Sequence, residues 1–234
     1  MFTLAVPTGS LDFWKTRLSD FGPEWFVNGL GEKSLMVDDP DGLRFHIAER
    51  PFTNAYAYTE VIPPEYAIQA VAGVTICARS DATKRFIEEK FSLLPSHTCK
   101  MESGQTKFRY TMGLQELDVI PLPTRSLAGR GTIHHVAFRT QSSFDQQNWL
   151  KWLVDHGSHP SEIKDRQYFR SIYFREPSGA LCEIATDDPG FLVDESKEQL
   201  GTALQLPSFM SRFRDDIVAG LPPITLPSST QQFV

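Results

Sequence analysis

Two adjacent histidines and a distant glutamate interrupt segments that otherwise have the apolar character of strands. His134 and His135 lie in residues 133–138, and Glu183 lies in residues 180–185. Successive side chains of a strand point to opposite faces, so at most one of the two histidines is expected to face a given cavity. A buried polar group without a partner costs roughly 2 to 7 kcal/mol, so Glu183 is expected to be solvated or to bind a ligand.

A third segment, residues 166–175, carries further polar candidates. Strand alternation places Ser171 and Tyr173 on one face and Arg170 on the other. The turn sequence Glu-Pro-Ser-Gly at residues 176–179 folds this strand back onto the strand that carries Glu183. With an odd number of loop residues, Tyr173 is expected directly across from Glu183 on the same face.

The bulk composition limits the classes of partner. The 234 residues are 41% hydrophobic, which is typical of a globular protein, and the net charge is -6 with a pI near 5.5. This charge provides no basic field for nucleic acid or for an anionic membrane, so a small molecule is the expected ligand. Three widely spaced cysteines and the lack of a long apolar run predict a soluble, cytoplasmic protein.

The elements that position the candidate residues recur along the chain. A strand, a capped helix and three further strands are expected in the first fifty residues, and the pattern then repeats, predicting an α+β fold of βαβββ modules. The predicted divisions are a module at 1–52, a connector at 53–67, modules at 68–122 and 123–190, and a C-terminal tail with a short helix at 191–234.

The repeat is also visible in the residues themselves. Residues 39–48 (DPDGLRFHIA) align with residues 176–185 (EPSGALCEIA), so His46 occupies the position that Glu183 holds in the later copy. At the position of His135 the middle copy has Thr75. A metal site in the first two copies would thus lack a histidine partner for His46. His46 is therefore interpreted as a buried or edge histidine and not as a metal ligand.

Several longer motifs carry a resemblance to a known family. The segments GTIHHVAFR, DRQYFRSIYFREPSG, EIATDDPGF and LGTALQLPSF resemble the vicinal oxygen chelate superfamily, in the branch of ring-cleaving dioxygenases that act on hydroquinones. The resemblance extends over most of the chain, including PTGSLDFW and PPEYAI in the connecting parts. It implies open eight-stranded cups built from paired βαβββ modules, three of which are visible here.

The resemblance also implies an activity and a set of site residues. The branch holds a mononuclear Fe(II) with two histidines and one glutamate, which leaves positions for a phenolate and for O2. By motif, His135 and Glu183 correspond to metal ligands, with Mn(II) or another divalent metal as an alternative to Fe(II). His134, Arg166 and Tyr173 correspond to residues that bind substrate oxygens and move protons.

One feature of the family pattern has no counterpart in this sequence. Family members begin with a further βαβββ module whose first strand carries the second histidine ligand, and Met1 falls at the start of what resembles the second module. The expected consequences are an inactive form, a site completed by another subunit of a homo-oligomer, or a protein that binds phenols or quinones without turnover. A glyoxalase-like lyase or isomerase with a different metal is a further alternative, against which the DRQYF and YFREP segments favour the dioxygenase branch.

Overall fold

A computed structural model describes residues 1–53, 57–101, 104–122 and 129–223 of the chain. These residues divide into two compact units. The first unit comprises Met1–Val136 and Glu176–Ala180, and the second comprises Ala137–Arg175 and residues 181–223. Each unit is described by itself below.

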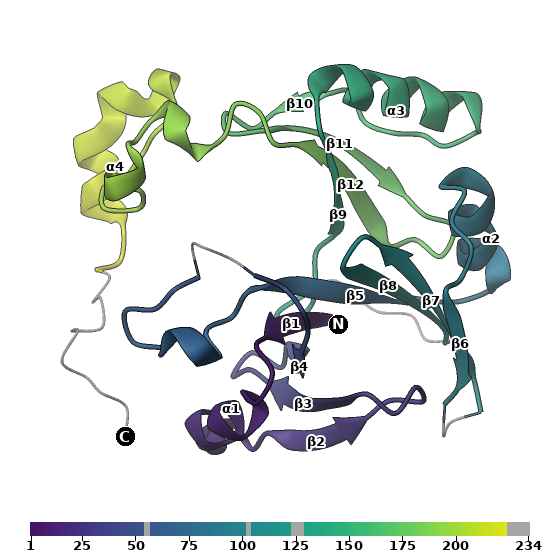
Figure 1. Ribbon diagram of the computed structural model, residues 1–234. Helices are drawn as coiled ribbons and strands as arrows, with labels where there is room; N and C mark the ends of the chain where they lie inside the picture. The colour runs from purple at the N-terminus through teal and green to yellow at the C-terminus, as the bar shows by residue number, and fades with distance from the viewer. Residues whose placement is uncertain (54–56, 102–103, 123–128, 224–234) are drawn as a thin grey trace. The chain divides into compact units, whose positions relative to one another are not determined.

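The first unit contains one mixed sheet of eight strands in the order β2-β3-β4-β1-β5-β8-β7-β6 (Figure 1). The strands are β1 (Phe2–Val6), β2 (Glu24–Val27), β3 (Lys33–Asp38), β4 (Arg44–Glu49), β5 (Ala70–Ala78), β6 (His97–Lys100), β7 (Thr106–Met112) and β8 (Gln115–Pro121). The helices are α1 (Leu11–Arg17) and α2 (Asp81–Lys90), with short 3-10 segments η1 (Ser19–Phe21) and η2 (Pro64–Tyr66). The predicted α+β class with an eight-stranded sheet is confirmed.

The pairing of strands shows why the repeat forms one continuous sheet. Within each half, the first strand runs parallel to the last, β1 with β4 and β5 with β8. The two halves join through the antiparallel pair β1 and β5. The first strand of each half is therefore central, and the polar residues on β1 and β5 lie in the middle of the sheet.

The apolar side of this sheet is closed by helix α1. Leu11 and Trp14 of α1 pack with Leu35 and Ile47 of the sheet, and all four side chains are buried. The indole Nε1 of Trp14 donates to the carbonyl oxygen of Tyr66 at 2.8 Å, which satisfies its only donor. Trp14 is thus part of the core, whereas Phe21, which the helical spacing also predicts to be core, lies in η1 and is 47% exposed.

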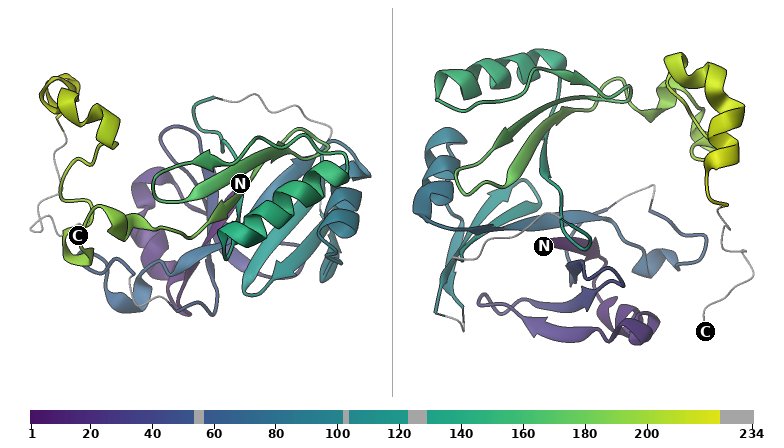
Figure 2. Two further views of the ribbon diagram at one scale, coloured as in Figure 1. Left: turned by 90° about the horizontal axis from the view of Figure 1, so that it is seen from above. Right: turned by 180° about the vertical axis from the view of Figure 1, so that it is seen from behind.

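A second sheet has four strands in the order β10-β11-β12-β9. The strands are β9 (Val136–Thr140), β10 (Lys164–Asp165), β11 (Arg170–Arg175) and β12 (Leu181–Thr186). Helix α3 (Ser143–Asp155) lies along β11 and β12 (Figures 1 and 2). Buried Gln146 of α3 donates to the backbone carbonyls of Arg170 and Ile184, both at 2.8 Å, and so links the helix to both strands.

The same order of elements recurs in all three segments. Each has a strand, a helix and three further strands, and in each the first strand lies beside the last. The tail adds 3-10 segments η3 (Phe191–Val193), η4 (Lys197–Gln199) and η5 (Ser208–Phe213), followed by α4 (Arg214–Gly220). The predicted module divisions remain a prediction. Residues 54–56 of the predicted connector, 123–128 of the predicted third module and 224–234 of the predicted tail lie outside the described residues.

Several local expectations are corrected by the structure. The strand expected at 133–138 begins only at Val136 and runs to Thr140. In the tail, where a short helix is expected, the residues from Ser208 to Phe213 form a 3-10 segment and the α-helix α4 begins only at Arg214. Ser10 stands at the start of α1, but its hydroxyl donates to the carbonyl of Glu65 and makes no cap hydrogen bond. Strands β6 and β10 had no sequence prediction, because their short polar sequences lack an alternating apolar pattern.

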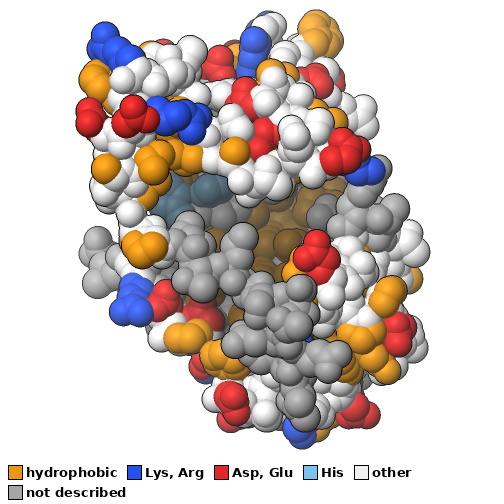
Figure 3. Space-filling view, turned by 90° about the vertical axis from the view of Figure 1, so that its left-hand side faces the viewer, with side chains coloured by type: hydrophobic (Ala, Val, Ile, Leu, Met, Phe, Trp, Pro, Cys, Tyr) orange, Lys and Arg blue, Asp and Glu red, His pale blue; other side chains and the backbone are white. Residues whose placement is uncertain are grey.

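The surface charges match the modest net charge of the sequence. Lys and Arg side chains are interspersed with Asp and Glu on the face that Figure 3 shows. Among the residues that the structure describes, no helix has the length and apolar character needed to cross a membrane.

Candidate functional site

The two histidines lie just before β9 and not within it. Because the strand begins at Val136, neither histidine is held by strand alternation, and the expectation that they point to opposite faces is wrong. Their rings meet edge to face with centroids 5.1 Å apart, and the two Nδ1 atoms are 2.8 Å apart. Strand pairing forces adjacent side chains to opposite faces, and this constraint does not apply to residues that precede the strand. The two imidazole rings can therefore come together.

This contact restricts the protonation of the pair. A hydrogen bond between two Nδ1 atoms requires one ring to donate and the other to accept. In the neutral pair, the donating ring carries its lone pair on Nε2, whereas the accepting ring carries a proton there. One histidine of the pair is therefore suited to bind a metal through Nε2, and the other is suited to donate a proton or a hydrogen bond.

Glu183 is a buried carboxylate on β12. It is 3% exposed, and the hydroxyl of the fully buried Ser171 on β11 donates to its Oε1. Tyr173 pairs directly with Glu183 in the antiparallel register of β11 and β12. The predicted placement of Tyr173 across from Glu183 is confirmed, because the intervening turn has the odd length that the prediction required.

Arg166 and Tyr173 lie together in the second unit. The Arg166 guanidinium Nη2 is 3.4 Å from the Tyr173 hydroxyl, and its carbon lies 5.4 Å from the centre of the tyrosine ring. Arg166 is exposed and falls in the segment between β10 and β11, where its backbone nitrogen donates to the carbonyl of Phe169. A guanidinium in this position can stabilise a phenolate oxygen that approaches the tyrosine.

The predicted site residues therefore form two groups. His134 and His135 contact each other in the first unit. In the second unit Tyr173 on β11 pairs with Glu183 on β12, and Arg166, which precedes β11, lies beside Tyr173. Within the described ranges, no three His, Cys, Asp or Glu side chains cluster in a way that could hold a metal ion. An imidazole nitrogen and a carboxylate oxygen suit a divalent transition metal, but the described residues do not complete a set of three ligands.

Sequence reasoning missed Ser171 as a partner of Glu183. The signal was present, because alternation places Ser171 on the same face as Tyr173 and a serine is small enough to be buried there. Its hydroxyl provides one of the hydrogen bonds that a buried carboxylate needs.

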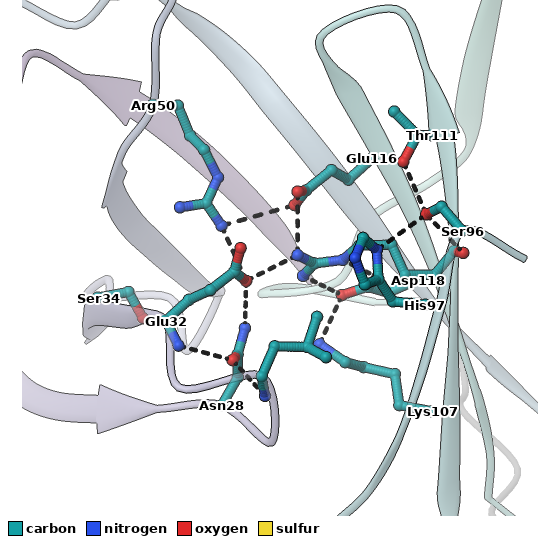
Figure 4. A network of polar contacts seen from close by, with 12 residues as sticks. Asn28, Glu32, Ser34, Arg50, Ser96, His97, Lys107, Thr111, Glu116 and Asp118 are labelled. Carbon is teal, nitrogen blue, oxygen red and sulfur yellow. Dashed lines mark hydrogen bonds and ion pairs between the residues drawn. The ribbon is translucent and has the colours of Figure 1, made fainter.

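A second polar group that sequence reasoning missed lies in the eight-stranded sheet. Arg109 is 5% exposed and donates to Asp118 at 2.8 and 3.0 Å, to Glu32 at 2.7 Å and to Glu116 at 2.9 Å. Arg50, Glu32, Glu116, Asp118 and Lys107 converge from separate segments around it (Figure 4).

The protonation of this network follows from burial and from its hydrogen bonds. Burial opposes charge on Arg109, but the hydrogen bonds with Asp118 and Glu32 raise its pKa above the ordinary value. Burial raises the pKa of Glu116, although the nearby Arg109 and Arg50 lower it. Burial also acts to raise the pKa of Glu32, but hydrogen bonds from Asn28 and Arg109 hold that pKa below the ordinary value.

His46 is buried on β4, as expected from its sequence. Its Nδ1 lies 2.9 Å from the hydroxyl of Ser34, and its ring packs edge to face on Phe26 with centroids 4.9 Å apart. Burial, followed by the charges of Arg44 and Lys107, lowers the pKa of His46 to about 4. The imidazole is therefore neutral at pH 7.

The fold defines the class of protein. The chain is similar over 96% of its length to the crystal structure of a "putative dioxygenase" from Bacillus subtilis, with a TM-score of 0.85 and 33% identity over 73% of that chain. The curled eight-stranded sheet and the recurring βαβββ segments are those of the vicinal oxygen chelate superfamily. No protein-family model matches the chain.

The curated relatives then identify the family. The chain is 37% identical over 225 residues to the "Putative ring-cleaving dioxygenase MhqE" of Bacillus subtilis, which covers 93% of this chain and 72% of the relative. It is 27% identical to the "Chlorohydroquinone/hydroquinone 1,2-dioxygenase" of Sphingobium indicum, over 91% of this chain and 69% of the relative. The chain therefore belongs to the ring-cleaving dioxygenases of this superfamily, in the branch that includes a hydroquinone dioxygenase.

Proposed function

We propose that this chain is an Fe(II)-dependent dioxygenase that cleaves the ring of hydroquinone-type aromatic diols with O2, in the cytoplasm. The observation that supports the proposal most is the arrangement on β11 and β12, where Tyr173 lies across from buried Glu183 and beside Arg166. The named relatives supply the reaction class.

The proposed metal ligands are Glu183 and one histidine of the adjacent pair, His135. Fe(II) bound to them supplies a centre at which a phenolate and O2 can meet. The third protein ligand of the family pattern is not among the described residues, so the proposal includes a ligand from outside them. A second copy of the chain in a homo-oligomer is one source of that ligand.

The roles proposed for the remaining residues follow from their hydrogen-bonding capacity. Tyr173 carries a hydroxyl that can donate to a substrate oxygen or accept from it, and Arg166 can neutralise the negative charge that develops there. His134, in contact with His135, can transfer a proton to or from the substrate. Ser171 is proposed to orient the Glu183 carboxylate through its hydrogen bond.

The test is oxygen uptake with hydroquinone by protein that is purified anaerobically and loaded with Fe(II), together with its metal content by elemental analysis. Glu183→Ala and His135→Ala are expected to lose bound iron, and His134→Ala is expected to retain it. Tyr173→Phe is expected to retain iron but to lower kcat/KM by roughly 100-fold or more, as removal of a proton donor does. Glu162→Ala is the matched control, because Glu162 is an exposed carboxylate paired with Lys164.

Uptake that is equal in Glu183→Ala and the unchanged chain would contradict the assigned ligand. Activity with Mn(II) but not with Fe(II) would show that the metal is Mn(II) and would leave the assigned ligand residues unchanged. Iron binding without oxygen uptake, combined with binding of hydroquinone, would favour the alternative of a protein that binds phenols or quinones without turnover.

A further inference from the structure

The segment that carries Arg166 lies between β10 and β11 and belongs to neither strand. Its backbone turns through Gln167, which has a left-handed conformation with φ of 67°. This conformation is costly for a residue with a side chain, and it persists only where surrounding contacts hold it. The position of the Arg166 guanidinium therefore depends on what fixes the turn at residues 166–169.

The start of the tail, directly after β12, supplies those contacts. One carboxylate oxygen of Asp194, Oδ2, accepts from the side-chain nitrogen of Gln167 at 2.5 Å and from the hydroxyl of Tyr168 at 2.9 Å. The Tyr168 ring stacks on Phe191 with centroids 4.9 Å apart, and the Gly190 backbone nitrogen donates to the Tyr168 carbonyl at 2.8 Å. The tail thus holds both residues of the turn through side chains and backbone.

The hydrogen bond between Tyr168 and Asp194 has a defined direction. It is the largest cause that raises the pKa of Tyr168 above the ordinary value, so the hydroxyl keeps its proton at neutral pH and remains the donor. The side-chain nitrogen of Gln167 can only donate. Both bonds therefore require an acceptor oxygen at position 194, and a carboxylate oxygen is a stronger acceptor than a neutral one.

The carboxylates nearest to Arg166 in this turn leave its guanidinium free. Asp165 accepts from the backbone nitrogen of Gln167 at 2.8 Å, and Asp194 accepts from two neutral side chains. Within the described ranges, Arg166 forms no ion pair, and its side chain contacts the hydroxyl and the ring of Tyr173. An exposed cation without a fixed carboxylate can pair with an anionic oxygen that approaches Tyr173.

We propose that Asp194 is a positioning residue for Arg166. By accepting from Gln167 and Tyr168, it fixes the turn so that the guanidinium stays beside Tyr173 and available to a ligand. This role rests on the proposed function, in which Arg166 neutralises the negative charge on a substrate oxygen. Asp194 acts through Arg166 and not on the substrate itself.

The first test is a nuclear Overhauser measurement on the metal-free chain. A contact between the guanidinium protons of Arg166 and the Tyr173 ring is expected in the unchanged chain, because the guanidinium carbon lies 5.4 Å from the ring centre. Asp194→Ala removes the acceptor, and Asp194→Leu does so while keeping the volume, so both should weaken this contact by roughly threefold or more. Asp194→Asn keeps an oxygen that can accept both bonds, and it should retain most of the contact.

Trypsin gives a second measurement that needs no metal. Cleavage after Arg166 requires local opening of the turn, and Asp194→Ala should accelerate it by roughly threefold to tenfold. Asp215→Ala is the matched control, because Asp215 is an exposed carboxylate in the first turn of α4 in the same tail. It should leave the cleavage rate unchanged.

Oxygen uptake by the Fe(II)-loaded chain separates a positioning role from a general loss of stability. Asp194→Ala should lower kcat/KM by roughly threefold to tenfold and leave the iron content unchanged. In a chain that already carries Arg166→Ala, the same replacement should have no further effect, because the group that it positions is absent. A further loss of the same size would overturn the proposal, because Asp194 would then act independently of Arg166.

An unchanged nuclear Overhauser contact in Asp194→Ala would also overturn the proposal, and so would cleavage after Arg166 at the rate of the unchanged chain. A chain that takes up no oxygen would count against the proposed function, and the two metal-free measurements would still decide whether Asp194 fixes Arg166. Asp194 is exposed, so thermal unfolding is expected to show that each variant is folded.

Discussion

The eight-stranded and four-stranded sheets place a carboxylate at the same strand position but surround it differently. Asp118, on the last strand of its segment, is held by two cations, Lys107 and Arg109. Glu183, on the last strand of its own segment, accepts from the hydroxyl of Ser171 and lies across from Tyr173. A carboxylate bound by fixed cations stabilises the fold, whereas the carboxylate of Glu183, to which Ser171 donates, is the one that we propose as a metal ligand.

The largest effect is expected from breaking the buried network. Arg109→Met should lower the free energy of unfolding by roughly 3 to 5 kcal/mol, because it leaves buried carboxylates without their cation. Chemical denaturation measures this change. The exposed pair between Arg44 and Asp38 is the control, and Arg44→Ala should cost about 1 kcal/mol or less. Equal losses in the two variants would show that the buried network stabilises the fold no more than an exposed ion pair does.

A smaller effect is expected from acid titration of the first unit. The pKa of His46 is about 4 in the folded chain, against 6.5 for the unperturbed group. The unfolded state therefore binds more protons in this window, and the stability contributed by neutral His46 is lost as the pH falls. The loss between about pH 7 and about pH 5 is roughly 2 kcal/mol.

Denaturation at several pH values checks this prediction, with His46→Gln as the comparison. The variant should have a flatter dependence on pH across the same window. An unchanged slope in His46→Gln would show that other groups cause the loss.

The smallest effect is expected at the hydroxyl that binds Glu183. Ser171→Ala should lower the free energy of unfolding by about 1 kcal/mol, because one hydrogen bond to a buried carboxylate is removed. Ser211→Ala, at an exposed position of η5, is the control and should be close to neutral. A loss as large as that of Arg109→Met would mean that Glu183 stabilises the fold as strongly as the buried network does.

Much of the fold could be predicted from the sequence because its patterns are local. The sequence predicts strands at residues 2–6 and 106–112, which form β1 and β7, and α2 begins after Ser80, whose hydroxyl accepts from the Ala82 backbone nitrogen. The register of Tyr173 and Glu183 followed from the length of a single turn. Each of these features depends on residues that are close in the sequence.

The contact between His134 and His135 could not be predicted in this way. Their sequence favours a strand, but β9 begins only at Val136. The start of β9 depends on its pairing with β12, which lies more than forty residues along the chain. The site residues themselves stay a prediction until metal binding is measured.

The sequence by itself determined the recurring elements, the family and the identities of the candidate residues, because periodicity, turn residues and long motifs are properties of contiguous segments. Only the tertiary structure decided that Asp118 is neutralised by cations, that Glu32 joins Arg109 from 77 residues away and that the eight strands enclose a cavity. The physical reason is that the charge balance of a buried group depends on which side chains surround it, and strand pairing over long separations sets those neighbours.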